Sequence, residues 1–162
     1  MDGLSSGDPV YVPDLDAAFV GGTVVTIGRD GTADVKLDES GNTCRIPLGE
    51  VRPRFERGGC TSQDNTSLVH MNDATILENL CQRHQRDEIY TYTASVLLAV
   101  NPYKEIDGLY GDEQCARYRG RHIGSLPPHP YAIADAAYRA LTREGRNQGM
   151  LISGESGAGK TE

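Results

Sequence analysis

The first third of the chain alternates apolar and polar residues over short stretches, which is the pattern of half-buried strands. In residues 32–37, for example, Ala33, Val35 and Leu37 share one face. A turn with a glycine, Gly31, precedes this stretch. The pattern predicts five short strands, at residues 10–12, 20–27, 32–37, 43–46 and 48–51. Short strands joined by tight turns indicate a small all-β, SH3-like barrel over residues 7–55.

Two roles are open for this predicted barrel. Its nearby aromatic residues, Tyr11, Phe19 and Phe55, could form a groove for a proline-rich peptide. Because three rings make a thin groove, a structural accessory role is favoured. Residues 56–66 are polar and contain a Gly-Gly pair, which predicts a linker to the next part of the chain.

Beyond the predicted linker, the sequence predicts one helix followed by two strands. A helix is predicted to begin at Asn72 or Asp73, because either side chain can cap it. Its buried face is expected to hold five residues at helical spacing: Ile76, Leu77, Leu80, Cys81 and His84. Residues 89–93 alternate and residues 95–100 form a nearly continuous apolar run. Both segments are predicted strands, and the second is expected to be buried on both faces.

Two more helices are predicted further along the chain. One begins near Asp112, and the three arginines within residues 117–121 are expected to form a solvated face. The other begins at Pro130, whose fixed φ suits a first helical turn, and ends at Gly145. Its apolar stripe is expected to comprise Ile133, Ala134, Ala137, Tyr138 and Leu141.

An apolar segment, residues 149–153, predicts a buried strand that leads into a glycine-rich sequence. That sequence fits the phosphate-binding P-loop pattern G-x-x-x-x-G-K-T. Eight residues make up the predicted loop: Gly154, Glu155, Ser156, Gly157, Ala158, Gly159, Lys160 and Thr161. The order of strand, helix, strand and P-loop indicates a partial α/β P-loop NTPase domain over residues 67–162, with a parallel or mixed sheet.

The residue types in this loop suit the tail of a nucleoside triphosphate. Gly154, Gly157 and Gly159 allow backbone N–H groups to turn inward around anionic oxygens. Lys160 adds a positive charge for the outer phosphates, and the Thr161 hydroxyl is placed to ligate Mg²⁺. The other interpretation is an accidental glycine-rich loop, which the strand-like segment before it disfavours.

A second group of residues, at the end of the apolar run 95–100, could hold a purine base. Its members are Asn101, Pro102, Tyr103, Lys104 and Tyr110. An asparagine amide can hydrogen-bond the edge of the base, while a tyrosine can pack on it or donate its hydroxyl. Taken by itself, the sequence Asn-Pro-Tyr-Lys is also an ordinary turn, and that interpretation is favoured on the residues alone.

Composition narrows the possible partners. A net charge of −7 and a pI of about 5.1 argue against broad binding to nucleic acid or to anionic membranes. No apolar run approaches the roughly 18 residues of a membrane span, and the acidic first residues do not suit a signal peptide. The four cysteines are widely spaced, so we expect free thiols in a reducing cytosol. Cys81 and His84 could share a metal, but packing is favoured because no further ligands accompany them.

Several blocks of sequence, in order, resemble the start of a myosin heavy chain. They lie at residues 85–92, 99–104, 118–121, 127–129, 131–139 and 151–162. The predicted N-terminal barrel is also similar to the SH3-like subdomain that many myosins carry. Most of the chain is therefore covered by the resemblance.

The resemblance implies an actin-activated Mg-ATPase motor located on the cytoskeleton in the cytoplasm. It implies that residues 154–161 cradle the phosphates of ATP, with Thr161 on Mg²⁺, and that the group from Asn101 to Tyr110 binds the purine. Seven residues separate Pro102 from Tyr110, where many myosins have six. Tyr110 therefore matches the tyrosine of the family's purine-binding loop only if the flexible Gly108 accommodates the extra residue.

The resemblance also implies that the family's switch loops, actin-binding cleft and light-chain-binding neck lie beyond Glu162. We therefore expect an N-terminal fragment with no catalytic residue of its own, which binds nucleotide but does not hydrolyse it at a useful rate. Light chains are expected to bind further downstream. Two other hypotheses remain: a non-motor P-loop ATPase or kinase, and a binding module in which the barrel docks partners and the P-loop is incidental.

Overall fold

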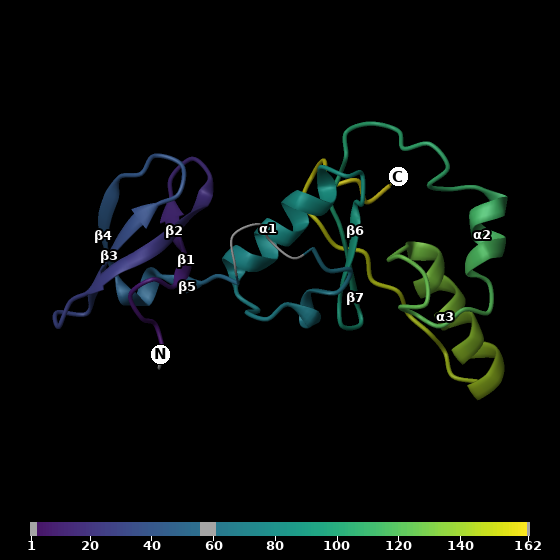
Figure 1. Ribbon diagram of the computed structural model, residues 1–162. Coiled ribbons are helices and arrows are strands. Elements are labelled where there is room, and N and C mark those ends of the chain that lie inside the picture. Colours follow the sequence, from purple (N-terminus) through teal and green to yellow (C-terminus); the bar gives the residue numbers. More distant parts are fainter. Residues whose placement is uncertain (1–2, 56–60, 162) are drawn as a thin grey trace. The chain divides into compact units, whose positions relative to one another are not determined.

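A computed structural model describes residues 3–55 and 61–161 of the chain (Figure 1). The Gly-Gly pair of the predicted linker and the fourth cysteine, Cys60, lie outside the described residues. The chain divides into two compact units. The first unit comprises Met1–Thr61 and Leu68–Asn79, and the second comprises Ser62–Ser67 and Leu80–Glu162. Each unit has its own sheet.

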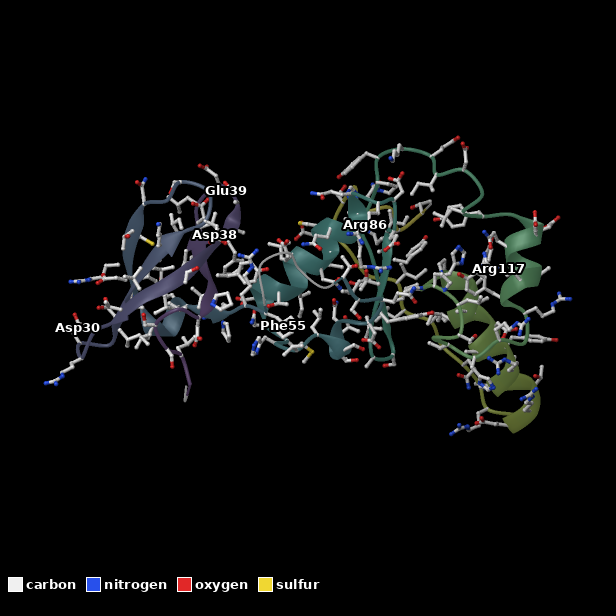
Figure 2. The ribbon with its side chains drawn as sticks, in the orientation of Figure 1. Asp30, Asp38, Glu39, Phe55, Arg86 and Arg117 are labelled. Atoms are coloured by element: carbon white, nitrogen blue, oxygen red, sulfur yellow. The ribbon has the colours of Figure 1, made fainter. Side chains whose placement is uncertain are left out.

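The first unit contains a five-stranded antiparallel sheet, and four of its strands lie where the alternating pattern predicts them. Its strands are β1 (Pro9–Asp14), β2 (Ala18–Ile27), β3 (Thr32–Leu37), β4 (Thr43–Pro47) and β5 (Arg52–Pro53). Their order in the sheet is β4-β3-β2-β1-β5. Gly31, in the turn between β2 and β3, has φ 79°, so the expected need for glycine in this turn is confirmed. Figure 2 places Asp38 and Glu39 at the next turn, between β3 and β4.

The last predicted strand, residues 48–51, is wrong. The structure has a 3₁₀ helix, Leu48–Glu50, and β5 begins after it. The Val51 N–H donates to the Leu48 carbonyl at 3.2 Å, which closes the helical turn. Because residues three apart face the same way in a 3₁₀ helix, Leu48 and Val51 can both meet the core in this conformation.

The core of the first unit is built mainly from valines. Its buried members are Val10, Val12, Val24, Ala33, Val35 and Val51. Glycine is required at Gly22, because a Cβ there would lie 2.6 Å from the Val35 Cγ1 atom. A register shift between Val24 and Thr26 marks a bulge in β2. Val24 is 1% exposed, whereas Val25 is 43% exposed.

Tyr11 is not an open ring on the surface of this unit. It is buried, and the Arg54 guanidinium lies over it, with 4.9 Å between the Arg54 Cζ atom and the ring centroid. Arg54 also pairs with Asp38 at 2.7 Å, which holds the guanidinium in this place. An aromatic groove for a proline-rich peptide would therefore have to be built from Phe19 and Phe55 without Tyr11.

The second unit combines helices with a hairpin. Its elements are the 3₁₀ helix η2 (Asn65–Ser67), β6 (Tyr90–Thr93), β7 (Val96–Ala99), α2 (Asp112–Tyr118) and α3 (Pro130–Glu144). The helix α1 (Asp73–His84) contributes its residues from Leu80 onward to this unit.

The predicted helix ends are confirmed. Asn72 caps α1, because its Oδ1 atom accepts a hydrogen bond from the Thr75 N–H at 2.9 Å. Pro130 occupies the first turn of α3, and Gly145 ends that helix with φ 65°. The arginines of residues 117–121 are exposed as expected, and Figure 2 shows Arg117 on α2.

The expectation that residues 95–100 form a strand buried on both faces is wrong. The two strands β6 and β7 form an antiparallel hairpin, and Val96 is 56% exposed. A parallel bridge between Asp64 and Tyr92 adds one contact at its edge. In this hairpin β6 is the strand buried on both faces, because its successive residues Thr91 and Tyr92 are 1% and 3% exposed, whereas both ends of β7 are exposed.

The strand predicted before the glycine-rich loop is also absent from the described residues. Residues 149–153 have no regular secondary structure, and Met150, Leu151 and Ile152 are exposed. A strand exists only where a neighbouring segment completes its hydrogen-bond ladder. Within the described ranges, the two sheets do not include this segment.

The predicted buried faces of two helices are wrong in part. On α1, Leu77 and Cys81 are exposed, and the structure buries Ala74, Asn79 and Arg83 instead. Arg83 is buried because its guanidinium donates to the Thr91 hydroxyl at 2.9 Å and to the Tyr90 carbonyl at 2.8 Å, so the hairpin offers a polar partner.

On α3, three members of the predicted apolar stripe are exposed and a different residue is fully buried. The exposed members are Ala134, Tyr138 and Leu141, and the buried residue is Ala132. Cys44, Cys81 and Cys115 are free thiols, as expected. No helix in residues 3–55 and 61–161 is long and apolar enough to cross a membrane.

We predict that Val24→Ala lowers the free energy of unfolding of the first unit by about 2 kcal/mol, because it removes buried methyl groups and leaves a cavity. The neighbouring variant Val25→Ala is the matched control, since that side chain is 43% exposed, and we expect it to cost less than about 0.5 kcal/mol. Urea unfolding, followed by NMR signals from β1–β5, measures both. Equal losses in the two variants would contradict the assigned core.

Candidate functional site

The glycine-rich loop adopts a conformation that depends on glycine. Gly157 and Gly159 have φ of 82° and 87°, in the left-handed region that other residues rarely enter. At Gly154 the reason is space, because a Cβ there would lie 3.1 Å from the Ala158 Cβ atom. The Ala158 N–H donates to the Glu155 carbonyl at 3.2 Å, which closes a tight turn. The loop is therefore a compact backbone turn that is closed by a hydrogen bond of its own.

Lys160 folds back onto this turn. Its ammonium donates to the carbonyl oxygens of Gly154 at 2.7 Å and Glu155 at 2.8 Å. These oxygens are neutral acceptors, and a charged phosphate oxygen is a stronger partner for an ammonium group. The structure thus places the positive charge of Lys160 at the turn, with partners that an anion can replace.

The Asn-Pro-Tyr-Lys segment meets the glycine-rich loop through one side chain. The Asn101 Nδ2 atom donates to the Gly157 carbonyl at 2.9 Å, across 56 positions of sequence. The Asn101 Oδ1 atom accepts from the Tyr103 N–H at 2.8 Å, and this bond folds its own segment into a turn. The structure therefore brings together the two groups of residues that the sequence singled out.

The other members of the predicted purine group lie in different surroundings. Tyr103 has φ 52° and an 85% exposed ring. Pro102 is half-buried, and the Lys104 ammonium pairs with Asp87 at 2.6 Å. Tyr103 is thus the member of this turn whose side chain is open to a flat ligand, whereas the charge of Lys104 is already paired.

Tyr110 belongs to an aromatic cluster that the sequence did not predict. The cluster consists of Tyr90, Tyr110, Tyr118, His129 and Tyr131. The Tyr110 hydroxyl makes a short hydrogen bond with the Tyr90 hydroxyl, and its ring centroid lies 5.7 Å from that of His129. Burial raises the pKa of Tyr90, and the bond with Tyr110 raises it further. The Tyr90 hydroxyl therefore stays protonated at neutral pH and can take part in this bond.

His129 is the centre of the cluster. It is 3% exposed and stacks on Tyr118, with 4.9 Å between the ring centroids. Its Nε2–H donates to the Leu109 carbonyl at 2.9 Å, and its Nδ1 atom accepts from the Tyr131 N–H at 3.1 Å. The ring thus caps α3 and holds the segment next to Tyr110. A histidine directly before a proline that begins a helix occupies the cap position, and this was the available sequence signal.

The ring of His129 must be neutral to make both hydrogen bonds, because its Nδ1 atom acts as an acceptor. Burial lowers the pKa of His129 below its usual value, and the bond to the Leu109 carbonyl raises it by a smaller amount. Both the hydrogen-bond pattern and the burial therefore favour the neutral ring.

Among residues 3–55 and 61–161, no group of three or more His, Cys, Asp or Glu side chains is arranged to hold a metal ion. Cys81 and His84, which the sequence analysis considered as a possible metal-binding pair, belong to no such group. His84 instead lies with its Nε2 atom 3.1 Å from the Asn101 carbonyl. Thr161, the predicted Mg²⁺ ligand, is exposed at the end of the loop.

Comparison with known proteins gives one family. Residues 62–162 match the family model described as "Myosin head (motor domain)". The chain is 40% identical over 159 residues to unconventional myosin-VI of Sus scrofa, and this covers 98% of the chain and 13% of that protein. It is 42% identical over 158 residues to myosin-13 of Arabidopsis thaliana, covering 96% of the chain and 10% of that protein. The chain thus spans a small part of the length of these relatives.

We predict that the second unit loses stability as the pH falls below about 6.5, the ordinary pKa of histidine. The pKa of His129 is lower in the folded state, so the unfolded state binds the proton first as the pH falls. The stabilising effect of the neutral His129 ring is therefore complete above about pH 6.5 and declines below it. Urea unfolding at about pH 7.5 and about pH 5.5 measures the change. His129→Gln is the control, since it keeps a donor but does not titrate. An identical pH slope in both proteins would show that another group is responsible.

Proposed function

The chain belongs to the myosin head (motor domain) family, and from this premise we propose that it binds Mg-ATP through residues 154–161 as the N-terminal part of an actin-based motor. The observation that carries the proposal is the glycine-dependent turn on which the Lys160 ammonium lies. A glycine-rich backbone turn with one cation beside it is suited to a polyphosphate.

The residues of the loop fit this ligand on steric and chemical grounds. Left-handed glycines at Gly157 and Gly159 leave the backbone uncovered, so phosphate oxygens can approach the N–H groups. Lys160 would hold the outer phosphates and Thr161 would hold Mg²⁺. When bound, Mg²⁺ neutralises part of the phosphate charge. The chain's own contribution is to bind and orient the phosphates.

We assign the base to the segment that begins at Asn101. Its predicted members are Asn101, Pro102, Tyr103, Lys104 and Tyr110. The bond between Asn101 and Gly157 supports this assignment, because it puts the segment next to the phosphate loop. The exposed ring of Tyr103 can pack on a purine, and Tyr110 is held by the aromatic cluster through Tyr90.

The two parts of the chain have separate roles in this proposal. Residues 7–55 form an SH3-like barrel with an accessory role, residues 56–66 link it, and residues 67–162 form the start of the motor domain. The β4-β3-β2-β1-β5 order of short antiparallel strands supports a small barrel. All the proposed ligand residues lie within the segment that matches the family model.

The whole protein is proposed to couple ATP hydrolysis to movement on actin filaments and to reside on the cytoskeleton in the cytoplasm. Family membership supports these assignments. Co-sedimentation of the full-length protein with actin filaments, in the presence and absence of ATP, tests the partner. Binding to actin that ATP does not weaken would argue against a motor.

We predict that Lys160→Ala weakens Mg-ATP binding by tenfold or more, roughly 1.5–3 kcal/mol for the loss of a charged hydrogen-bond donor. Lys36→Ala is the matched control, because Lys36 lies on β3 of the first unit and we expect a change of less than about twofold. Isothermal titration calorimetry on the 162-residue chain measures both. Equal affinity in Lys160→Ala and the wild type would favour an incidental loop.

We also predict that the 162-residue chain, supplied with ATP and Mg²⁺, does not release phosphate at a useful rate. The proposed site binds the phosphates and the base but contains no group assigned to position the attacking water. Steady-state phosphate release by purified protein, with and without actin filaments, is the measurement. Turnover at the rate of a motor would mean that a catalytic residue has been overlooked.

A further inference from the structure

Asn101 connects three segments: the P-loop, its own turn and the end of α1. It does so through both polar groups of its side chain and through its backbone carbonyl. Its Nδ2 atom donates to Gly157 of the P-loop, and its Oδ1 atom accepts from Tyr103 of its own turn. Its backbone carbonyl lies 3.1 Å from the Nε2 atom of His84, the last residue of α1. The Asn101 amide is therefore engaged at both ends by the protein itself.

The bond to Gly157 fixes more than one atom of the loop. A peptide group is planar and trans, so the carbonyl of Gly157 and the N–H of Ala158 point in opposite directions. Holding the Gly157 carbonyl on the Asn101 side therefore directs the Ala158 N–H into the turn, where it donates to the Glu155 carbonyl. Gly157 has φ 82° and no side chain of its own to hold this peptide plane.

Asn101 also packs against the next glycine of the loop. A Cβ at Gly159 would lie 3.7 Å from the Asn101 Nδ2 atom, so the amide borders the loop on that side. His84 supports Asn101 from behind, because a carbonyl oxygen can only accept and the histidine Nε2–H must donate. The three groups form a continuous chain from α1 to the centre of the P-loop.

We propose that Asn101 is a positioning residue for the triphosphate, which fixes the peptide plane after Gly157, and that His84 fixes Asn101. This inference rests on the proposed function, since it concerns the same P-loop. Within the segment to which we assign the base, it gives the Asn101 amide to the phosphate loop and leaves the contacts with the purine to the other members. A base-reading residue affects only ligands that carry a base, whereas a positioning residue affects any polyphosphate.

The experiment compares Mg-ATP with inorganic Mg-tripolyphosphate, which has no base, on the 162-residue chain. We expect Asn101→Ala to weaken both ligands equally, by about 3- to 10-fold, the usual effect of one lost hydrogen bond. Asn147→Ala is the control, because this asparagine is exposed beyond α3, and it should leave both affinities unchanged. A loss for ATP alone, with tripolyphosphate binding unchanged, would overturn the positioning role.

Variants of His84 test the second part of the proposal independently. We expect His84→Leu to weaken tripolyphosphate binding and His84→Gln, which keeps a donor, to restore most of it. Gln85→Leu, at the exposed neighbouring position, is the control for the added apolar side chain. Failure of glutamine to do better than leucine would remove His84 from the proposal.

Hydrogen exchange gives a readout that does not depend on a ligand. In Asn101→Ala, amides of residues 155–159 should exchange faster than in the wild type, while those of β1–β5 stay unchanged. Unchanged exchange in the loop would overturn the proposal even if affinity falls.

Binding of the two ligands by the wild type distinguishes a failure of the proposed function from a failure of the positioning role alone. If the wild type binds neither ligand, or if Lys160→Ala binds as well as the wild type, the proposed function fails and the positioning role falls with it. If the wild type binds both ligands through Lys160 but Asn101→Ala leaves tripolyphosphate affinity unchanged, only the positioning role fails.

Discussion

The hydrogen bond from the Asn101 amide to the Gly157 carbonyl determines how the rest of the second unit can act as a site. Residues 145–154 have no regular secondary structure, so no sheet holds the glycine-rich loop that follows them. Side chains do so instead, with Asn101 binding from outside the loop and Lys160 from within it. Because a side-chain bond can break and form again more easily than a ladder of backbone bonds, this arrangement suits a loop that must exchange its own contacts for those of an anion.

The turn that contains Asn101 is itself held by neighbours of different chemistry. His84 approaches its carbonyl, and the ion pair between Lys104 and Asp87 holds the next part of the turn. Further along, Tyr110 is fixed by the buried cluster around His129. The neutral state of His129 is thus a structural requirement, since protonation would remove the acceptor that caps α3 and would place a charge among four tyrosine rings.

Features that depend on local sequence could be predicted, and features that depend on distant partners could not. The cap at Asn72, the start at Pro130 and the glycine at Gly31 follow from the residues nearby, and the structure contains all three. The buried faces of α1 and α3 depend on what packs against each helix, so the helical spacing of apolar residues predicted them incorrectly in part. Arg83 is the clearest case, because the hydrogen bonds that it donates to the hairpin keep this charged residue more buried than Leu77 on the same helix. The motif residues were visible in the sequence, but the bond between Asn101 and Gly157 was not, since 56 positions separate them.

The strand predicted at residues 149–153 shows why apolar character alone does not decide structure. Leu151 and Ile152 are both apolar and isoleucine has high strand propensity, yet their segment is exposed and irregular. The phosphate-binding proposal does not need that strand, because the turn of the loop depends on Gly154, Gly157 and Lys160 rather than on the segment before it. The family match over residues 62–162 includes both groups of proposed ligand residues. An incidental glycine-rich loop would have no reason to be tied to the segment to which we assign the base, so the bond between Asn101 and Gly157 supports the proposal of a single nucleotide site.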